Sequence, residues 1–119
     1  MNPGTHNIEI YQGATYTLNV IVKDSLGVAK DLTGYSGRGA IKRKATDVEP
    51  IAEFTVVVAQ DASGEVSVSL TDEETSAITT KGISYKDVEK YFYDVEIYKT
   101  GDVIRLLQGL ANVSPEISR

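Results

Sequence analysis

Apolar and polar residues alternate with a period of two along most of the chain, whereas the spacing of an amphipathic helix is rare. Residues 16–23 form the first clear strand, because Leu18, Val20 and Val22 all point to one face. The other extended segments are residues 7–11, 36–44, 52–58, 65–70, 91–98 and 103–113. The pattern predicts a protein built almost entirely of β-strands.

Turn residues predict two hairpins. Asp61-Ala62-Ser63-Gly64 joins the strand that ends at Val58 to the strand that starts at Glu65. Thr100-Gly101 joins the last two strands, and a turn there sets their register. The facing pairs predicted from that register are Ile97 with Ile104, Val95 with Leu106, and Glu96 with Arg105.

One short helix is predicted between strands. In Thr71-Asp72-Glu73-Glu74 the threonine hydroxyl can accept the amide of Glu74, and the Glu74 carboxylate can reach back to the amide of Thr71. Acidic residues in the first turn also meet the positive end of the helix dipole. This capping box predicts a helix over residues 72–78.

About seven strands, regular turn signals and one helical turn predict an antiparallel immunoglobulin-like β-sandwich. The length of 119 residues fits one domain. We expect an N-terminal arm at residues 1–6, the sandwich at 7–114 and a C-terminal tail at 115–119. The chain has no Cys and no Trp, so the core must form without the disulfide and tryptophan of antibody domains.

Composition narrows the classes of partner. The chain has 17 Asp and Glu against 12 Lys and Arg, a net charge of −5, which disfavours a sequence-independent nucleic-acid binder. Residues 1–7 lack the pattern of a secretory signal, and the longest apolar run, residues 54–59, has the length of a strand. We therefore expect folding in a cytoplasm, with neither nucleic acid nor a membrane as a partner.

Few side chains suggest catalysis. His6 is the only histidine, and a metal site needs several ligands that converge from fixed elements. Asp94 and Glu96 share one face of a strand, as the carboxyl pair of a glycosidase does, but Arg105 is a ready partner for them. We expect no catalytic residue, no metal site and no cofactor.

Surface residues suggest contacts with other proteins. Residues 36–44 combine Gly37 and Gly39 with a run of cations, which fits an edge strand or a strand closely approached by another backbone. The cations are interpreted either as a solvated edge or as a site for an acidic partner. Among the crowded aromatics, we expect either that Tyr98 or one of Tyr91 and Phe92 is exposed, or that all of them are half-buried on the surface of the sheet. The candidate contact residues are Arg38, Lys42, Arg43, Lys44, Tyr91, Tyr98, Pro115 and Ile117.

The order of several short segments resembles a known family. The segments are residues 31–34 (Asp-Leu-Thr-Gly), 41–44 (Ile-Lys-Arg-Lys), 64–71 (Gly-Glu-Val-Ser-Val-Ser-Leu-Thr), 93–97 (Tyr-Asp-Val-Glu-Ile), 105–109 (Arg-Leu-Leu-Gln-Gly) and 113–116 (Val-Ser-Pro-Glu). Together they resemble the small β-sandwich module of bacteriophage tails, best known as the N-terminal domain of the baseplate upper protein. The likeness runs from about Asn7 to Glu116.

The resemblance implies a non-enzymatic structural protein of the phage particle, assembled in the host cytoplasm and present in many symmetric copies. In this role the chain is an adaptor or attachment module of the tail, baseplate or neck, and its partners are other phage structural proteins. A capsid decoration protein is the alternative within this class. A carbohydrate-binding module is a second alternative, which a concave row of exposed aromatics would favour. The arm and the tail are expected to order only against neighbouring proteins.

Overall fold

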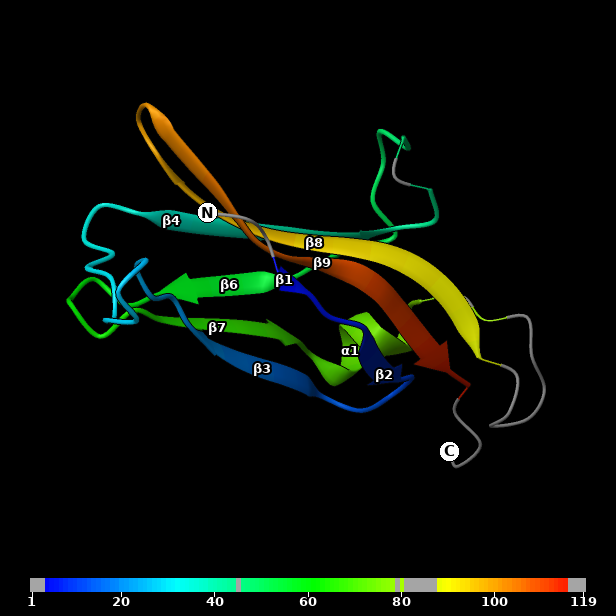
Figure 1. Cartoon of the computed structure of the whole chain (residues 1–119). Coiled ribbons are helices and arrows are strands. Elements are labelled where there is room, and N and C mark those ends of the chain that lie inside the picture. The colour runs from blue at the N-terminus through cyan, green and yellow to red at the C-terminus, as the bar shows by residue number, and fades with distance from the viewer. Residues whose placement is uncertain (1–3, 45, 79, 81–87, 116–119) are drawn as a thin grey trace.

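In a computed structural model that describes residues 4–44, 46–78, 80 and 88–115, the strands lie in two facing layers (Figure 1). One layer contains β4, β8 and β9, and the other contains β3, β6 and β7. The strands are β1 (Gly4–Thr5), β2 (Ile8–Tyr11), β3 (Tyr16–Ile21), β4 (Ser36–Lys42), β5 (Ala52–Glu53), β6 (Thr55–Val58), β7 (Glu65–Leu70), β8 (Glu89–Lys99) and β9 (Asp102–Ser114). The helix α1 spans Asp72–Ser76.

The strand order is that of an immunoglobulin-like β-sandwich, as predicted. The larger sheet has the order β1-β9-β8-β4-β5, with β2 also paired to β9, and the smaller has the order β3-β7-β6. The strands β3-β7-β6 correspond to the B, E and D strands of an immunoglobulin domain, and β4, β8 and β9 correspond to C, F and G. One feature differs from a purely antiparallel sandwich, because β1 and β2 run parallel to β9.

The described part of the chain contains nine strands, two more than predicted. The predicted strand 52–58 divides at Phe54, where the chain leaves β5 in the larger sheet and enters β6 in the smaller one. The second addition is β1, which lies within the predicted arm. Both differences depend on which strand a segment pairs with, which alternation along the sequence does not reveal.

Aliphatic and aromatic side chains from both sheets fill the core. Phe54 lies between two tyrosines, with its ring centroid 6.4 Å from that of Tyr16 and 6.1 Å from that of Tyr93. Tilted and edge-to-face rings at such distances attract each other in addition to burying apolar area. This aromatic cluster lies in the layer between the sheets, where an antibody domain has its disulfide and tryptophan.

The predicted helix and its cap are confirmed. The amide of Glu74 donates to Thr71 Oγ1, and the amide of Thr71 donates to Glu74 Oε1 at 2.8 Å. The helix ends at Ser76, two residues before the predicted end at Ile78. Ile78 lies in the core with no exposed area, so it closes this end of the sandwich.

The β8–β9 hairpin has the predicted register near its turn and a shifted one beyond it. Ile97 faces Ile104 and Glu96 faces Arg105, as predicted. The prediction that Val95 faces Leu106 is wrong, because a bulge opposite the step from Val95 to Glu96 makes Leu107 the partner of Val95. The bulge inserts one residue into β9, and Leu106 is buried there.

The two glycines of β4 lie where another segment comes close. This agrees with the interpretation of residues 36–44 as a strand that another backbone approaches. A Cβ at Gly37 would overlap Val56 Cγ1 and lie 2.9 Å from Val56 Cβ. A Cβ at Gly39 would lie 3.0 Å from a ring carbon of Phe54. The missing side chains let β6 of the smaller sheet cross close to β4.

The N-terminal arm differs in part from the expectation that it orders only against neighbours. Gly4 and Thr5 pair with β9, and the amide of His6 donates to the carbonyl of Gln108 at 2.9 Å. The Tyr93 hydroxyl donates a hydrogen bond to the carbonyl of His6. Residues 4–6 therefore pack on the protein's own sheet, and residues 1–3 and 116–119 lie outside the described residues.

Candidate interaction surface

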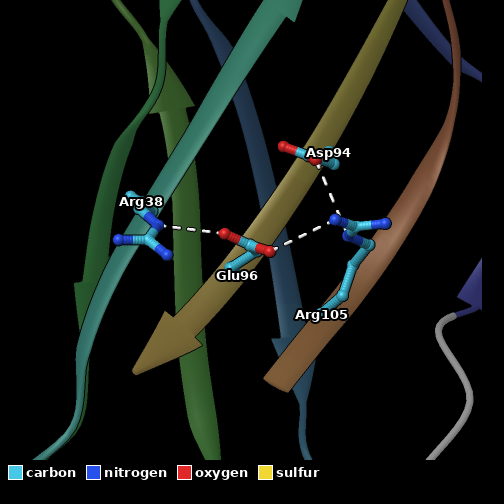
Figure 2. Close-up of polar contacts among 4 residues, drawn as sticks. All are labelled: Arg38, Asp94, Glu96 and Arg105. Carbon is cyan, nitrogen blue, oxygen red and sulfur yellow. Dashed lines mark hydrogen bonds and ion pairs between the residues drawn. The ribbon is translucent and has the colours of Figure 1, made fainter. Parts of the chain in front are cut away.

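The solvent-facing side of β4, β8 and β9, called here the outer face, carries a row of alternating charges (Figure 2). Arg38 Nε on β4 lies 2.9 Å from Glu96 Oε1 on β8. On the other side of Glu96, Arg105 Nη2 of β9 lies 3.4 Å from Oε2. Arg105 Nε also lies 3.7 Å from Asp94 Oδ2. One carboxylate is thus held between two guanidinium groups from the neighbouring strands.

Strand register explains this row. Arg38 faces Glu96 across β4 and β8, and Glu96 faces Arg105 across β8 and β9. The side chains of Arg38 and Arg105 are about half exposed (57% and 48%), so each pair contributes at most about 1 kcal/mol to stability. The row therefore sets the pattern of charge on the outer face and adds little to the stability of the fold.

The carboxyl pair weighed as a catalytic candidate lies in this row. Asp94 and Glu96 are both in contact with Arg105, and Glu96 also accepts from Arg38. The contact of Glu96 with Arg105 agrees with the predicted register, and Arg38 is a second partner that the sequence does not indicate. The geometry gives both carboxylates a role in charge pairing.

A hollow of about 400 Å³ lies beside the charge row on the outer face. Its apolar lining includes Ala40, Phe92 and Leu110, which come from β4, β8 and β9. Its polar lining includes Lys42, Arg105 and Gln108. Phe92 is 47% exposed, so a large part of its ring is open to another molecule. An apolar floor with a charged rim is typical of a contact site for another molecule.

Several of the predicted contact residues meet on or near the outer face. Arg38 and Lys42 lie on the same face of β4, and the Arg38 guanidinium lies 4.6 Å from the centroid of the Tyr98 ring. Tyr98 is half-buried under this cation. Lys42 lines the hollow. The sequence indicates the cations of β4 and the aromatic residues of β8 separately. The pairing of β4 with β8 brings them together.

The remaining predicted contact residues lie elsewhere. Tyr91 is 1% exposed, so its prediction as an exposed contact residue is wrong; the alternation of β8 points it into the core and turns Phe92 outward. Arg43 lies 5.4 Å from the centroid of the Tyr91 ring, and Lys44 is exposed beyond the end of β4. Pro115 is half-buried after β9, and Ile117 lies outside the described residues.

The hollow contains residues that the sequence pattern does not single out. Phe92 was weighed as one of three aromatics, and strict alternation from Tyr91 and Tyr93 would have placed it outward. Leu110 and Gln108 had no such signal, because their place beside Phe92 and Asp94 depends on the bulge in β9. The cations form no single patch, since Arg38 is paired with Glu96. A site for an acidic partner stays a prediction.

The part of the chain that the structure describes bears on two further classes of site. Within it, no three side chains among His, Asp and Glu are grouped so as to hold a metal ion. Over the same residues, no helix has the length and apolar character needed to cross a membrane.

Tyr93 gives the fold a specific sensitivity to alkaline pH. Burial raises the pKa of Tyr93 to about 12, above its ordinary value of 10.0. Since the folded state keeps this proton at a pH where the unfolded chain releases it, the free energy of unfolding falls as the pH rises from about 10 to about 12. The expected loss from this residue is about 2 kcal/mol.

Urea unfolding at pH 9 and at pH 11.5 measures this loss. Tyr93→Phe removes the ionisable group, so the variant is expected to lose less stability between the two conditions than the wild type. The variant also loses one hydrogen bond to the carbonyl of His6, which lowers its stability at pH 9 by about 1 kcal/mol. An identical alkaline loss in both proteins would contradict the assignment to Tyr93.

The chain was compared with protein families, with curated proteins and with solved structures, and only the solved structures gave a match. No family model matches the chain, and no curated protein matches it. One solved structure to which it is similar is that of the natural-killer-cell receptor NKp44, described as a triggering partner in natural cytotoxicity. The alignment covers 98% of this chain and 100% of that one, with 12% identity and a TM-score of 0.45.

Proposed function

We propose that this chain is a non-enzymatic structural protein of a bacteriophage particle, which attaches other particle proteins through its outer face. The order of short segments that resembles the tail β-sandwich module supports the phage role. The hollow beside the charge row carries the proposal of an attachment surface. In this role the protein makes or breaks no covalent bond, and its work is the burial of surface between partners.

The chemistry of the hollow defines the partner that fits it. Half-exposed Phe92 and neighbouring Leu110 provide an apolar floor for an apolar side chain of the partner. Lys42 lines the hollow, and its ammonium group forms no ion pair with the described residues. A carboxylate of the partner, placed next to its apolar side chain, would therefore meet an available cation.

Particle incorporation tests this function. An antibody raised against the chain is expected to detect it in purified phage particles from the source culture. Phe92→Ala is expected to reduce incorporation severalfold, since truncation of an aromatic anchor commonly costs more than 1 kcal/mol of binding. Leu26→Ala is a matched control, because Leu26 is 85% exposed in a turn outside the outer face.

Three outcomes contradict the proposal. The first is absence of the protein from particles while it accumulates in the cell. The second is equal incorporation of Phe92→Ala and the wild type, which removes the outer face from attachment. The third is sugar binding in a glycan array that Phe92→Ala abolishes, which would favour a carbohydrate-binding module instead.

A further inference from the structure

Among the described residues, no strand pairs with the outer edge of β3. β3 is the last strand of the smaller sheet, which has the order β3-β7-β6. In an immunoglobulin domain the first strand can lie beside the strand that corresponds to β3. Here β1 and β2 lie along β9 instead, on the other sheet, and β3 runs along the margin of the molecule (Figure 1).

The pairing of β3 with β7 determines which backbone groups point away from the sheet. The amide of Val22 donates to the carbonyl of Gly64 at 2.8 Å, and the register continues through Val20 with Val66 to Tyr16 with Leu70. In an antiparallel pair, hydrogen-bonded positions alternate along the strand. The amides and carbonyls that point outward therefore belong to Thr17, Asn19 and Ile21. No backbone hydrogen bond to these groups from outside the β3–β7 ladder occurs in the described part of the chain.

The side chains along this edge are suited to pairing. Thr17, Asn19 and Ile21 are exposed and uncharged, with Ile21 55% exposed. On the core side, the three residues that face β7 remain half-buried, although each partner on β7 is about 1% exposed. These half-buried residues are Tyr16, Leu18 and Val20. A further strand on this edge would bury their remaining apolar area.

The edge lacks the features by which natural proteins prevent strand addition. Such features are charged side chains, proline, bulges and very short strands. β3 has six residues with no charge and no proline, and it pairs with β7 without a break in register. By contrast, β2 carries Glu9, and β5 carries Glu53 and has two residues. The third alternative, β6, is uncharged but has four residues.

We propose that β3 pairs in antiparallel fashion with β3 of a second copy of this chain, about a twofold axis through Asn19. In this register Asn19 faces Asn19 of the second copy, and Thr17 faces Ile21 at both ends. Each facing pair exchanges two backbone hydrogen bonds, so all the outward groups of these three residues are paired. The two smaller sheets then form one continuous sheet.

A second copy fits this edge because the edge is complementary to itself. The chain has a net charge of −5, so contact between two copies costs least where the interface brings no like charges together. Along β3 the twofold axis places no charge opposite another, and the amide group of asparagine can both donate to and accept from its symmetry mate. This interface lies on the sheet opposite the outer face, and it does not depend on the phage role.

A charge at the axis tests the pairing. Wild-type protein is expected to be a dimer by sedimentation velocity at micromolar concentration, and Asn19→Lys is expected to be a monomer, because it places two like charges directly opposite each other. Ser67→Lys is the matched control: Ser67 faces Asn19 from β7, so the same charge appears on the same sheet but one strand away from the edge. Ser67→Lys is expected to remain dimeric.

A cysteine at the axis tests the register independently of any loss of stability. The chain has no Cys, so Asn19→Cys introduces a single thiol. Hydrogen-bonded antiparallel partners have Cα atoms about 5.5 Å apart, within the range that a disulfide spans. Mild oxidation is expected to produce a covalent dimer of Asn19→Cys at a much higher yield than of Ser67→Cys.

Defined results overturn the proposal. Wild-type protein that remains monomeric up to the highest soluble concentration would contradict the proposed pairing. A dimer that persists in Asn19→Lys would also contradict it. A dimer broken by Val57→Lys but not by Asn19→Lys would place the contact on β6. Equal crosslinking of Asn19→Cys and Ser67→Cys would reject the twofold register.

Discussion

Replacement of Gly37 by alanine is expected to lower the free energy of unfolding by about 1–3 kcal/mol. The new methyl group would overlap Val56 Cγ1 and lie 3.2 Å from Val58 Cγ2. Both valines belong to β6, which passes close to β4 at this point. Since neither backbone can withdraw without disturbing its own sheet, the two layers must separate locally. Urea unfolding followed by circular dichroism measures the change.

A double-mutant cycle tests the cause. Val56→Ala alone creates a small space in the core, and combined with Gly37→Ala it removes the overlapping methyl group. The double variant is therefore expected to be more stable than the sum of the two single effects. Gly4→Ala is the control, because its Cβ would be in ordinary contact at 3.5 Å from Leu107 Cδ2. A stable Gly37→Ala protein, or strict additivity, would contradict the close approach.

Replacement of Phe54 by alanine is expected to cost about 3–5 kcal/mol, the largest effect expected of any variant considered for this protein. Phe54 is 7% exposed and contacts the rings of Tyr16 and Tyr93. Its removal leaves a cavity between the sheets and takes away both ring contacts. A small domain has a total stability of about 5–15 kcal/mol, so a large part of it would be lost.

Phe92→Ala is the matched control for this variant. The chemical change is identical, but Phe92 is 47% exposed on the outer face. Its effect on the free energy of unfolding is expected to be within about 1 kcal/mol, because surface substitutions seldom cost more. Similar losses in the two variants would show that Phe54 does not carry the contact between the sheets.

The sequence predicted those parts of the fold that depend on neighbouring residues. The capping box of α1 needs only residues 71–74, and the hairpin at Asp61–Gly64 needs only a turn between two alternating strands. The bulge in β9 was missed because Leu106 and Leu107 are both apolar, so the alternation looks similar with either residue facing inward. The pairing of β1 with β9 joins residues about a hundred positions apart, and no local pattern encodes it.

The sequence predicted single residues of the outer face but not their common surface. Arg105 and Glu96 followed from the hairpin register, and Arg38 and Lys42 followed from the charges of their strand. These residues share one surface because β4 pairs with β8. That pairing joins residues far apart in the chain, so the sequence pattern does not reveal it. The hollow around Phe92 needed the three-strand arrangement as well, since each of its apolar residues is unremarkable alone.

The parallel pairing of β1 and β2 with β9 has a mechanical consequence. Force applied through the segments before β1 and after β9 pulls these strands past each other along their own length. The interstrand bonds between Gly4 and Tyr11 on one side and Leu107 and Ser114 on the other are then loaded together in shear, rather than broken one at a time. A domain held in this way is expected to resist a pulling force along β9 better than one whose terminal strands peel apart bond by bond.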